Sequence, residues 1–387
     1  MFIILNIIKR RNFCSGGFMK FKISCSELRN ELLILSGVLV AKTTHPILGC
    51  ILFEAKGGKL FLTATDLEVS LQSSIECEIE EEGAVAVPGK ILIETMRELP
   101  DYPVEISSDE EFRVKLKTSS GEFKIFGADY KEYPQVPKIK KKVVFNLDSS
   151  KIKRMIEKVI FAVSRDELKG VLTGVLFQVK KEELRLVATD GHRLSKVVDK
   201  TFRSDEITKD IIIPPKALNL FMRNVDSEKI TFTVGESFVV FDLGNKCIYS
   251  SLLQGEFPDY ESVIPLENEK KLIVDREKFI QSLRIVQVFA NRMTLQVKMN
   301  ISKGEMEIVS EDVDRGEGRE KVPVDYDDES MTIGFNAGYL LDSLKCIETE
   351  DVLLELKEPD SGCIILPRMQ KEGEEHFMLV MPIKLKD

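Results

Sequence analysis

Polar and hydrophobic positions along this chain follow two periods, one of two residues and one close to the 3.6 residues of a helical turn. Strict alternation, as over 112–117, is typical of a strand that buries one face and exposes the other. Spacing of three and four residues, as in Ile152, Met155 and Ile156, is typical of a helix with one apolar stripe. Because the two patterns alternate, we expect an α+β protein in which helices pack on antiparallel sheets.

The same succession of elements occurs three times. Each copy begins with a short strand and an amphipathic helix, and these helices are expected over 24–42, 148–166 and 275–292. Two alternating strands then end in similar phrases, whose aspartates Asp66, Asp190 and Asp312 lie 124 and 122 residues apart. A second helix follows in each copy, over 89–99, 214–226 and 336–348. The repeat predicts three similar domains, each of two helices on antiparallel sheets, over 19–142, 143–268 and 269–387.

The linkers and the ends of the chain follow from composition. The lysine-rich stretch 138–142 and the polar stretch 266–271 are expected to join the domains. Residues 1–18 precede the repeat, and we expect them to be disordered and dispensable. No apolar run approaches the roughly 20 residues that a membrane-spanning helix needs. The run at 2–8 is followed rather than preceded by positive charge, unlike a signal peptide, so we expect a cytoplasmic protein.

Candidate catalytic and metal-binding residues are few. Seven cysteines are scattered without a Cys-x-x-Cys pair, which indicates neither a zinc site nor a disulfide framework. Asp190, His192 and Ser195 lie within one short stretch, whereas a catalytic triad is assembled from separated segments. The chain also lacks a phosphate-binding loop and a His-Glu-x-x-His motif. We therefore expect no enzyme activity, no cofactor and no metal.

Charge is unevenly distributed along the chain. The net charge of −9 taken alone argues against a nucleic-acid binder. The six predicted helices nevertheless carry 16 Lys or Arg against 12 Asp or Glu. In the helix over 148–166, Lys151, Arg154, Lys158 and Arg165 form a stripe away from the apolar one. If the helices faced a common interior, that interior would attract phosphates without reading bases.

Five short strings, in order within the repeat, resemble the beta subunit of bacterial DNA polymerase III, the sliding clamp. They are HPILG at 45–49, ATDLE at 64–68, ATDGHRL at 188–194, FPDY at 257–260 and MPIKL at 381–385. Their order and their places in the repeat make the resemblance specific, and it extends over about 19–385.

The resemblance implies the DNA clamp fold and a non-catalytic processivity factor. In that family two chains of three domains join head to tail into a closed ring, with helices lining the hole. Such a ring encircles duplex DNA and slides along it without sequence preference. The expected partners are duplex DNA, the DNA polymerase III catalytic subunit, the clamp loader, other clamp-binding replication and repair proteins, and a second copy of this chain. A scaffold protein built from the same repeat, which would not close a ring, is the alternative interpretation.

The resemblance also implies a hydrophobic pocket for partner peptides between the second and third domains. The matching positions are Leu172, Thr189, Gly191, His192, Arg193, Leu194, Pro258, Val263, Val380, Met381, Pro382, Ile383, Lys384 and Leu385. Methionine and proline supply adaptable apolar surface, and Arg193 and Lys384 are expected to meet partner groups at the rim. The family often has an arginine just before Val263, where this chain has Ser262.

Two further sets of residues are expected at the ring seam and at the DNA. By resemblance, Phe123 and Ile125 of the first domain meet Val288 and Phe289 of the third. A position in the core is the other interpretation of these four residues. The expected DNA contacts are Lys42 and Lys169, which match the family, and Lys151, Arg154, Lys158 and Arg223, which come from the helix pattern.

Overall fold

The computed structural model describes residues 18–40, 44–137, 142–206 and 209–385. The expected extension over 1–18 lies outside these residues except for Phe18, and the expected linker over 138–142 lies outside except for Lys142. By their internal contacts the residues form two compact units. One consists of the chain up to Leu147 together with Asn219–Ser251, and the other of Asp148–Leu218 together with Leu252–Asp387.

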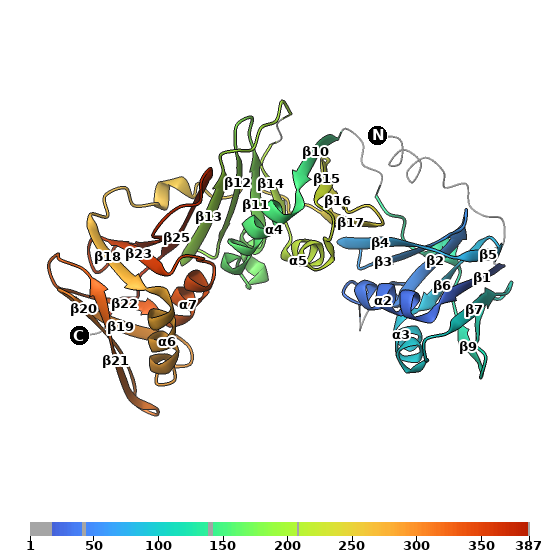
Figure 1. Ribbon diagram of the computed structural model, residues 1–387, viewed down its shortest axis with the longest axis horizontal. Coiled ribbons are helices and arrows are strands. Elements are labelled where there is room, and N and C mark those ends of the chain that lie inside the picture. Colours follow the sequence, from blue (N-terminus) through green and yellow to red (C-terminus); the bar gives the residue numbers. More distant parts are fainter. Residues whose placement is uncertain (1–17, 41–43, 138–141, 207–208, 386–387) are drawn as a thin grey trace. The chain divides into compact units, whose positions relative to one another are not determined.

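The described residues repeat one order of elements three times (Figure 1). The first copy contains β1 (Met19–Ser24), α2 (Cys25–Leu35), β2 (Cys50–Lys56), β3 (Lys59–Thr65), β4 (Val69–Glu76), β5 (Glu78–Glu81), β6 (Gly83–Pro88), α3 (Gly89–Glu98), β7 (Pro103–Ser108), β8 (Arg113–Lys117) and β9 (Glu122–Phe126). The second contains β10 (Val143–Asp148), α4 (Ser149–Glu157), β11 (Val175–Val179), β12 (Leu184–Thr189), β13 (Arg193–Asp199), β14 (Ile211–Ile213), α5 (Pro215–Asn224), β15 (Lys229–Val234), β16 (Phe238–Asp242) and β17 (Lys246–Ser251). The third contains β18 (Lys270–Asp275), α6 (Arg276–Gln287), β19 (Gln296–Ser302), β20 (Glu305–Asp312), β21 (Gly316–Asp325), β22 (Met331–Asn336), α7 (Ala337–Lys345), β23 (Asp351–Leu356), β24 (Cys363–Pro367) and β25 (Glu374–Val380). The predicted α+β class with helices on antiparallel sheets is therefore confirmed.

The first helix of each repeat is shorter than its sequence pattern predicts. Helix α2 ends at Leu35 rather than near 42, and α4 ends at Glu157 rather than near 166. Gly37, Val38 and Val40 follow α2, and glycine and valine have lower helix propensity than alanine or leucine. The predicted starts are accurate for α4 and α6, where the caps Asp148 and Asp275 accept hydrogen bonds from backbone N–H groups of the first turn.

In the first unit, the described residues form a five-stranded and an eight-stranded antiparallel sheet. The five-stranded sheet has the order β5-β1-β7-β8-β9, so β9 lies at its edge. The eight-stranded sheet has the order β10-β15-β16-β17-β4-β3-β2-β6. It passes from the second repeat to the first at the β17·β4 pair, where Ile248 lies opposite Leu71. Because this sheet continues from the first repeat into the second, the first compact unit includes part of the second repeat.

In the second unit, the described strands form one sheet of twelve. Its order is β14-β11-β12-β13-β25-β24-β23-β18-β21-β20-β19-β22. It passes from the second repeat to the third at the β13·β25 pair, where Leu194 lies opposite Leu379. Helices α6 and α7 pack side by side against the strands of the third repeat (Figure 1). Phe279 of α6, Leu340 of α7 and Phe335 of β22 are fully buried in the core between these layers.

The polar stretch 266–271 is anchored to the third repeat. Leu266 is exposed, but Asn268 is buried and its side chain donates hydrogen bonds to the carbonyl groups of Glu355 and Gly362. Strand β18 begins at Lys270, inside the expected linker. No helix in the described part of the chain is long and apolar enough to span a membrane.

Candidate functional site

The turn between β12 and β13 is stabilised by hydrogen bonds from its backbone N–H groups to its own side chains. Asp190 accepts bonds on Oδ1 from the backbone N–H groups of His192 (2.9 Å) and Arg193 (3.0 Å). Gly191 has a φ of +89°, a conformation that favours glycine, and its N–H donates to Thr189 Oγ1 at 3.1 Å. The turn therefore presents His192 to solvent.

Arg193, which follows this turn, lies inside the protein rather than at a rim. Its side chain is 6% exposed and donates from Nε to Asp190 Oδ2, from Nη1 to Asp342 Oδ2 and from Nη2 to the carbonyl of Phe161. Three protein acceptors therefore surround its guanidinium, and a contact between Arg193 and partner groups stays a prediction. Its role is to join β13 to α7 and to the short helix Ile160–Ala162.

Aromatic rings complete the surroundings of Arg193. The guanidinium carbon lies 4.5 Å from the ring centroid of Tyr339 and 5.3 Å from that of Phe161. The rings of Tyr339 and His192 stack with centroids 6.4 Å apart. Burial, together with the nearby Asp190, raises the pKa of Tyr339. Sequence analysis missed Phe161, Tyr339 and Asp342, because nothing local marks residues that meet a side chain distant in the sequence.

The C-terminal tail after β25 is anchored by backbone hydrogen bonds to the turn before β13 and to β22. The N–H of Met381 donates to the carbonyl of His192 at 2.9 Å, and the N–H of Ile383 donates to the carbonyl of Gly334 at 2.8 Å. A Cβ atom on Gly334 would lie 2.8 Å from Ile383 O and 2.6 Å from Leu385 Cδ2. Glycine at position 334 therefore leaves the space that the tail occupies.

An apolar cluster lies beneath the turn and the tail. Its buried members are Leu176, Val187, Leu194, Ile212, Tyr260, Ile364, Phe377 and Leu379. Val171, Phe257 and Ile264 pack against it. Above it, Val263 is 58% exposed and Met381 is 39% exposed. We call this region, formed by 189–194, 257–264 and 380–385, the tail surface.

The structure brings most of the expected pocket residues to the tail surface. Val380 lies opposite Arg193 in the β13·β25 ladder, so the turn and the tail are neighbours. Leu172 is half-buried, and Val171 beside it packs on the same apolar cluster. Pro258 and Lys384 are exposed, and Pro382, Ile383 and Leu385 are half-buried. Ser262 donates its hydroxyl to the carbonyl of Asp259 at 2.7 Å.

The cationic stripe of α4 faces carboxylates of the sheet. Asp199 and Glu374 lie directly opposite each other on β13 and β25, an unfavourable pairing of like charges. Lys151 pairs with Asp199 at 2.7 Å, Arg154 pairs with Glu374 at 2.9 Å, and the ammonium of Lys158 also binds Glu374. Ion pairs within the protein thus occupy the stripe, most completely at Lys158, whose side chain is 9% exposed.

Burial and neighbouring charges lower the pKa values of Glu374 and His376 on β25. Burial favours the neutral form of Glu374, but hydrogen bonds from Lys158 and Arg154 outweigh it and lower the pKa of this carboxyl. His376, two residues along β25, is 1% exposed and its Nε2 has no hydrogen-bond partner. Burial, with a contribution from Lys158, lowers the pKa of His376 to about 3. His376 is therefore neutral in the folded protein at pH 7.

The other expected DNA contacts differ in accessibility. Lys42 lies outside the described residues. Lys169 is half-buried, and its ammonium donates to the carbonyl of Asp190 at 2.7 Å. Arg223, on the last turn of α5, is exposed and forms no ion pair with the described residues.

The four expected seam residues fall into two groups. Phe123 on β9 is 38% exposed and Val288 after α6 is 64% exposed. Ile125 is 5% exposed, which agrees with the alternative interpretation of a position in the core. Phe289 is half-buried, with its ring over Gly318 of β21. Phe126, which sequence analysis missed, is 78% exposed on the same edge strand as Phe123.

The described residues hold no arrangement suited to catalysis. The Asp190 carboxylate serves the turn and Arg193, and the hydroxyl of Ser195 donates to the carbonyl of Lys158. No group of three or more His, Cys, Asp or Glu in the described ranges could hold a metal ion.

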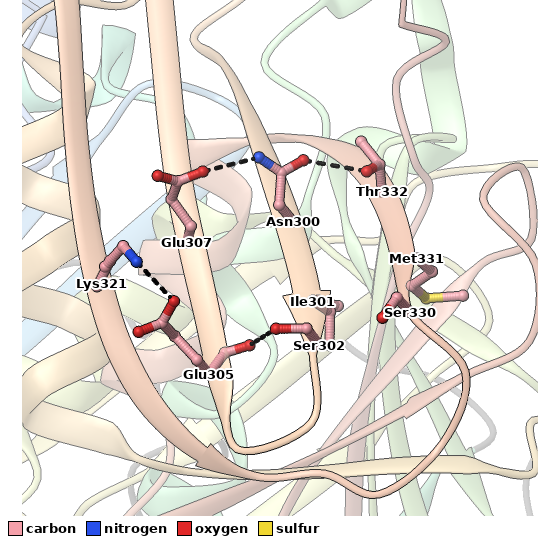
Figure 2. A pocket seen from close by; sticks show the side chains of 9 residues that line it. All are labelled: Asn300, Ile301, Ser302, Glu305, Glu307, Lys321, Ser330, Met331 and Thr332. Atoms are coloured by element: carbon pink, nitrogen blue, oxygen red, sulfur yellow. Dashed lines mark hydrogen bonds and ion pairs between the residues drawn. The ribbon is translucent and has the colours of Figure 1, made fainter.

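A polar hollow of about 340 Å³ lies on the outer strands of the third repeat (Figure 2). Asn300 donates to Glu307 and accepts from Thr332, and Lys321 donates to Glu305. These polar groups satisfy one another, so the hollow provides no activated acid, base or nucleophile.

Comparison with known proteins identifies relatives over the whole repeat. Family models of the DNA polymerase III beta subunit match in order: the N-terminal domain at residues 19–137, the central domain at 146–259 and the C-terminal domain at 261–383. The beta sliding clamp of Chlamydia muridarum is 31% identical over 370 residues, which cover 95% of this chain and all of that relative. The solved DNA polymerase III beta subunit of Thermotoga maritima has a TM-score of 0.86 at 31% identity. The solved sliding clamp of Bartonella birtlesii, bound to griselimycin, has a TM-score of 0.90 at 29% identity. Both structural alignments cover 95% of this chain and all of the other.

Proposed function

This chain belongs to the family of bacterial DNA polymerase III beta subunits, the beta sliding clamps, and from this premise we propose how it closes around DNA and where its partners bind. The observation that carries the function is the match of all three clamp domains, in order, over one chain. The protein is a non-catalytic processivity factor that tethers the replicative polymerase to DNA. As part of the replication machinery, we place it in the cytoplasm.

The ring is proposed from the pairing of equivalent strands. Strand β4 of the first repeat pairs with β17, the last strand of the second. Its counterpart β13 in the second repeat pairs with β25, the last strand of the third. The third counterpart is β21, and the remaining last strand is β9 of the first repeat. The same rule therefore pairs β21 of one chain with β9 of a second chain.

Both strands have an edge available for this pairing. Strand β9 ends the five-stranded sheet and pairs, among the described strands, with β8. Strand β21 pairs with β20 along 316–323, and β18 covers its opposite edge at Val324 and Asp325. The opposite edge of 316–322 faces no strand in the part of the chain that is described. A free edge is a template for another chain, and two such head-to-tail contacts close a ring.

Apolar side chains support the same seam. Phe123 and Phe126 are exposed on β9, and Ile285 and Val288 are exposed at the end of α6. Counted from the caps Asp148 and Asp275, the position in the second repeat that matches Ile285 is Lys158, which binds Glu374. At this position the proposed contact between chains is apolar where the contact within the chain is ionic. Phe289 stabilises β21 from behind, through its contact with Gly318.

The tail surface is the proposed binding site for partner peptides. Its apolar part consists of the buried cluster and the exposed Val263 and Met381. The exposed His192 gives this hydrophobic surface a polar edge. The polymerase catalytic subunit, the clamp loader and other clamp-binding proteins would compete for it. Ser262, bound to the Asp259 carbonyl, leaves this edge without the cation that the family often has.

DNA contact is proposed for Arg223 and Lys169, with Lys42 as a third cation. Arg223 is exposed and unpaired within the described residues. Lys169 would have to share its ammonium between phosphate and Asp190. Lys151, Arg154 and Lys158 are excluded from this set, because carboxylates already neutralise them. Few phosphate contacts suit a protein whose hold on DNA is topological.

The decisive test compares nicked circular DNA with the same DNA linearised, after loading by a clamp loader. The expected result is retention on circles and rapid loss from linear ends. Equal retention on both substrates would mean ordinary surface binding. No retention on either, with a loader shown to be active on a known clamp, would favour a scaffold that does not close.

A further inference from the structure

Lys196 on β13 is a buried lysine without a carboxylate partner. The residue is 9% exposed, and no ion pair or hydrogen bond joins its ammonium group to the described residues. Lysine is rarely buried to this extent unless it is paired. The feature is specific to this position, since Lys200, just past the end of the same strand, is exposed and binds Glu375 at 2.6 Å.

Two aromatic rings hold the ammonium group of Lys196. It lies 5.4 Å from the ring centroid of Phe377, which is directly opposite on β25, and 5.8 Å from that of Tyr260. The Tyr260 ring is itself fixed, because its hydroxyl donates to Gln178 Oε1 at 2.8 Å. Rings stabilise a desolvated cation, but by less than the burial of a charge costs.

The nearest carboxylates are engaged elsewhere. Arg185 binds both Glu183 and Glu261 at 2.7 Å. Glu375 binds Lys200. Burial lowers the pKa of Lys196 and the neighbouring Arg185 adds to that effect, while Glu375, Glu261 and Glu183 act in the opposite direction. Because these three carboxylates form their ion pairs with Arg185 and Lys200, the ammonium group of Lys196 lacks a direct acceptor.

Lys196 also lies on the face of the sheet that carries the tail surface. Alternate residues of a strand share a face, so Lys196 follows Leu194 on that face at a distance of roughly 7 Å. Leu194, Phe377 and Tyr260 all belong to the apolar cluster beneath the tail surface. The short helix Glu261–Val263, which begins directly after Tyr260, carries the exposed Val263 of that surface.

We propose that Lys196 recognises an acidic residue of the bound partner peptide, whose side-chain carboxylate binds the ammonium group between Phe377 and Tyr260. The inference rests on the proposed role of the tail surface as the partner-binding site. It assigns a charge preference to a surface whose other contacts are apolar. A carboxylate would supply the acceptor that this desolvated ammonium lacks.

The test uses fluorescent peptides copied from the clamp-binding segment of the same bacterium's polymerase III catalytic subunit. Glutamate is placed in turn at each position that flanks the apolar residues of this segment. For each such peptide, a second peptide with glutamine at the same position is the neutral control. All peptides carry an amidated C-terminus, and one pair is also made with a free C-terminus. Binding is measured by fluorescence anisotropy to the full-length wild-type dimer, Lys196→Met and Lys200→Met.

At one or more positions, the glutamate peptide should bind wild-type protein about tenfold more tightly than its glutamine match. Lys196→Met should remove this preference while it binds the glutamine peptide as wild type does, and Lys200→Met should keep the preference. Lys196→Arg, which retains the charge, should restore at least part of it. These results together would support the proposal.

Three outcomes would overturn it. A wild-type protein that binds every glutamate and glutamine pair equally has no acidic preference, although the tail surface would still bind peptide. A preference that survives in Lys196→Met, or that appears with the free C-terminus alone, belongs to another group. Failure of wild-type protein to bind any peptide of the set would instead remove the proposed binding site itself.

Discussion

The Nη1 atom of Arg193 lies 2.9 Å from Asp342 Oδ2, and this ion pair joins the first residue of β13 to helix α7. Arg193 belongs to the second repeat and Asp342 to the third. The pair lies directly behind His192, which is exposed, and beside Tyr339, whose ring stacks on His192. A contact between repeats thus positions the turn at which partners are proposed to bind.

Replacing Arg193 by lysine should destabilise the protein even though the charge is kept. A lysine cannot donate in three fixed directions to Asp190, Asp342 and Phe161, and its ammonium stacks less well on rings. We expect a loss of about 1–3 kcal/mol in the free energy of unfolding, measured by urea denaturation. Partner-peptide affinity should fall as well. The matched control is Arg368→Lys, which alters an exposed pair with Asp351 and should change neither quantity. Wild-type stability of Arg193→Lys would show that the fixed directions of the three arginine N–H donors are unimportant.

Glu374→Gln should weaken the attachment of α4 to the sheet. The substitution leaves the buried ammonium of Lys158 beside a neutral amide, and removal of one partner from a buried pair costs roughly 3–5 kcal/mol. Urea denaturation of Glu374→Gln and of Glu375→Gln, its more exposed neighbour, measures the difference. Since the folded-state pKa of Glu374 is lowered, its stabilisation is present above the ordinary carboxyl pKa and lost as pH falls through the folded value. Equal stability of the two variants near neutral pH would contradict the assignment.

His376 should make the folded protein sensitive to mild acid. The unfolded chain binds a proton on this side chain near pH 6.5, whereas the folded state, with a pKa of about 3, does not. The unfolded state therefore holds more protons between these values, and stability falls by up to about 1.4 kcal/mol for each pH unit as the solution becomes more acidic. Between pH 6 and 5, above the titration range of most carboxyls, wild-type protein should lose about 1 kcal/mol more than His376→Phe. Parallel pH profiles for the two proteins would show that this histidine does not contribute.

Phe126→Glu should convert the proposed dimer to a monomer. The residue is 78% exposed on the edge strand β9, and a carboxylate there would have to be desolvated in an apolar seam. Size-exclusion chromatography with light scattering measures the change, with Met369→Glu as the control, because Met369 is equally exposed at 75% but lies outside the proposed seam. Phe123→Glu combined with Phe289→Glu should have the same effect as Phe126→Glu. An intact dimer in these variants would place the seam at other strands.

Removal of residues 381–387 should abolish partner binding and leave the proposed ring assembled. The N–H of Met381 and that of Ile383 hold the tail on His192 and Gly334, and neither contact belongs to β9 or β21. Peptide binding is measured by anisotropy and assembly by light scattering on the same sample. Unchanged peptide affinity would move the binding site away from the tail surface, and loss of the dimer would tie the tail to the seam.

Much of this architecture can be read from the chain. The period of the apolar residues predicts which side chains share one face of a helix or strand, and that relation is local. The three copies of the strand–helix–strand order were predicted in this way. The helix starts at Asp148 and Asp275 were predicted from their capping residues, and the family from a resemblance that includes the strings around Asp190 and Met381. The α+β class and the clamp family are confirmed. The exact domain boundaries and the site assignments stay predictions.

The tertiary structure decided what lies opposite each face. The stripe of Lys151, Arg154 and Lys158 was correctly placed on one side of α4, but the pattern could not show that Asp199 and Glu374 cover it. Arg193 was expected at the rim and is buried, because Asp342 approaches from a helix 149 residues further along the chain. Periodicity constrains neighbours within about one helical turn or one strand, whereas charge neutralisation and burial depend on contacts between distant segments, which follow only from how the sheets join.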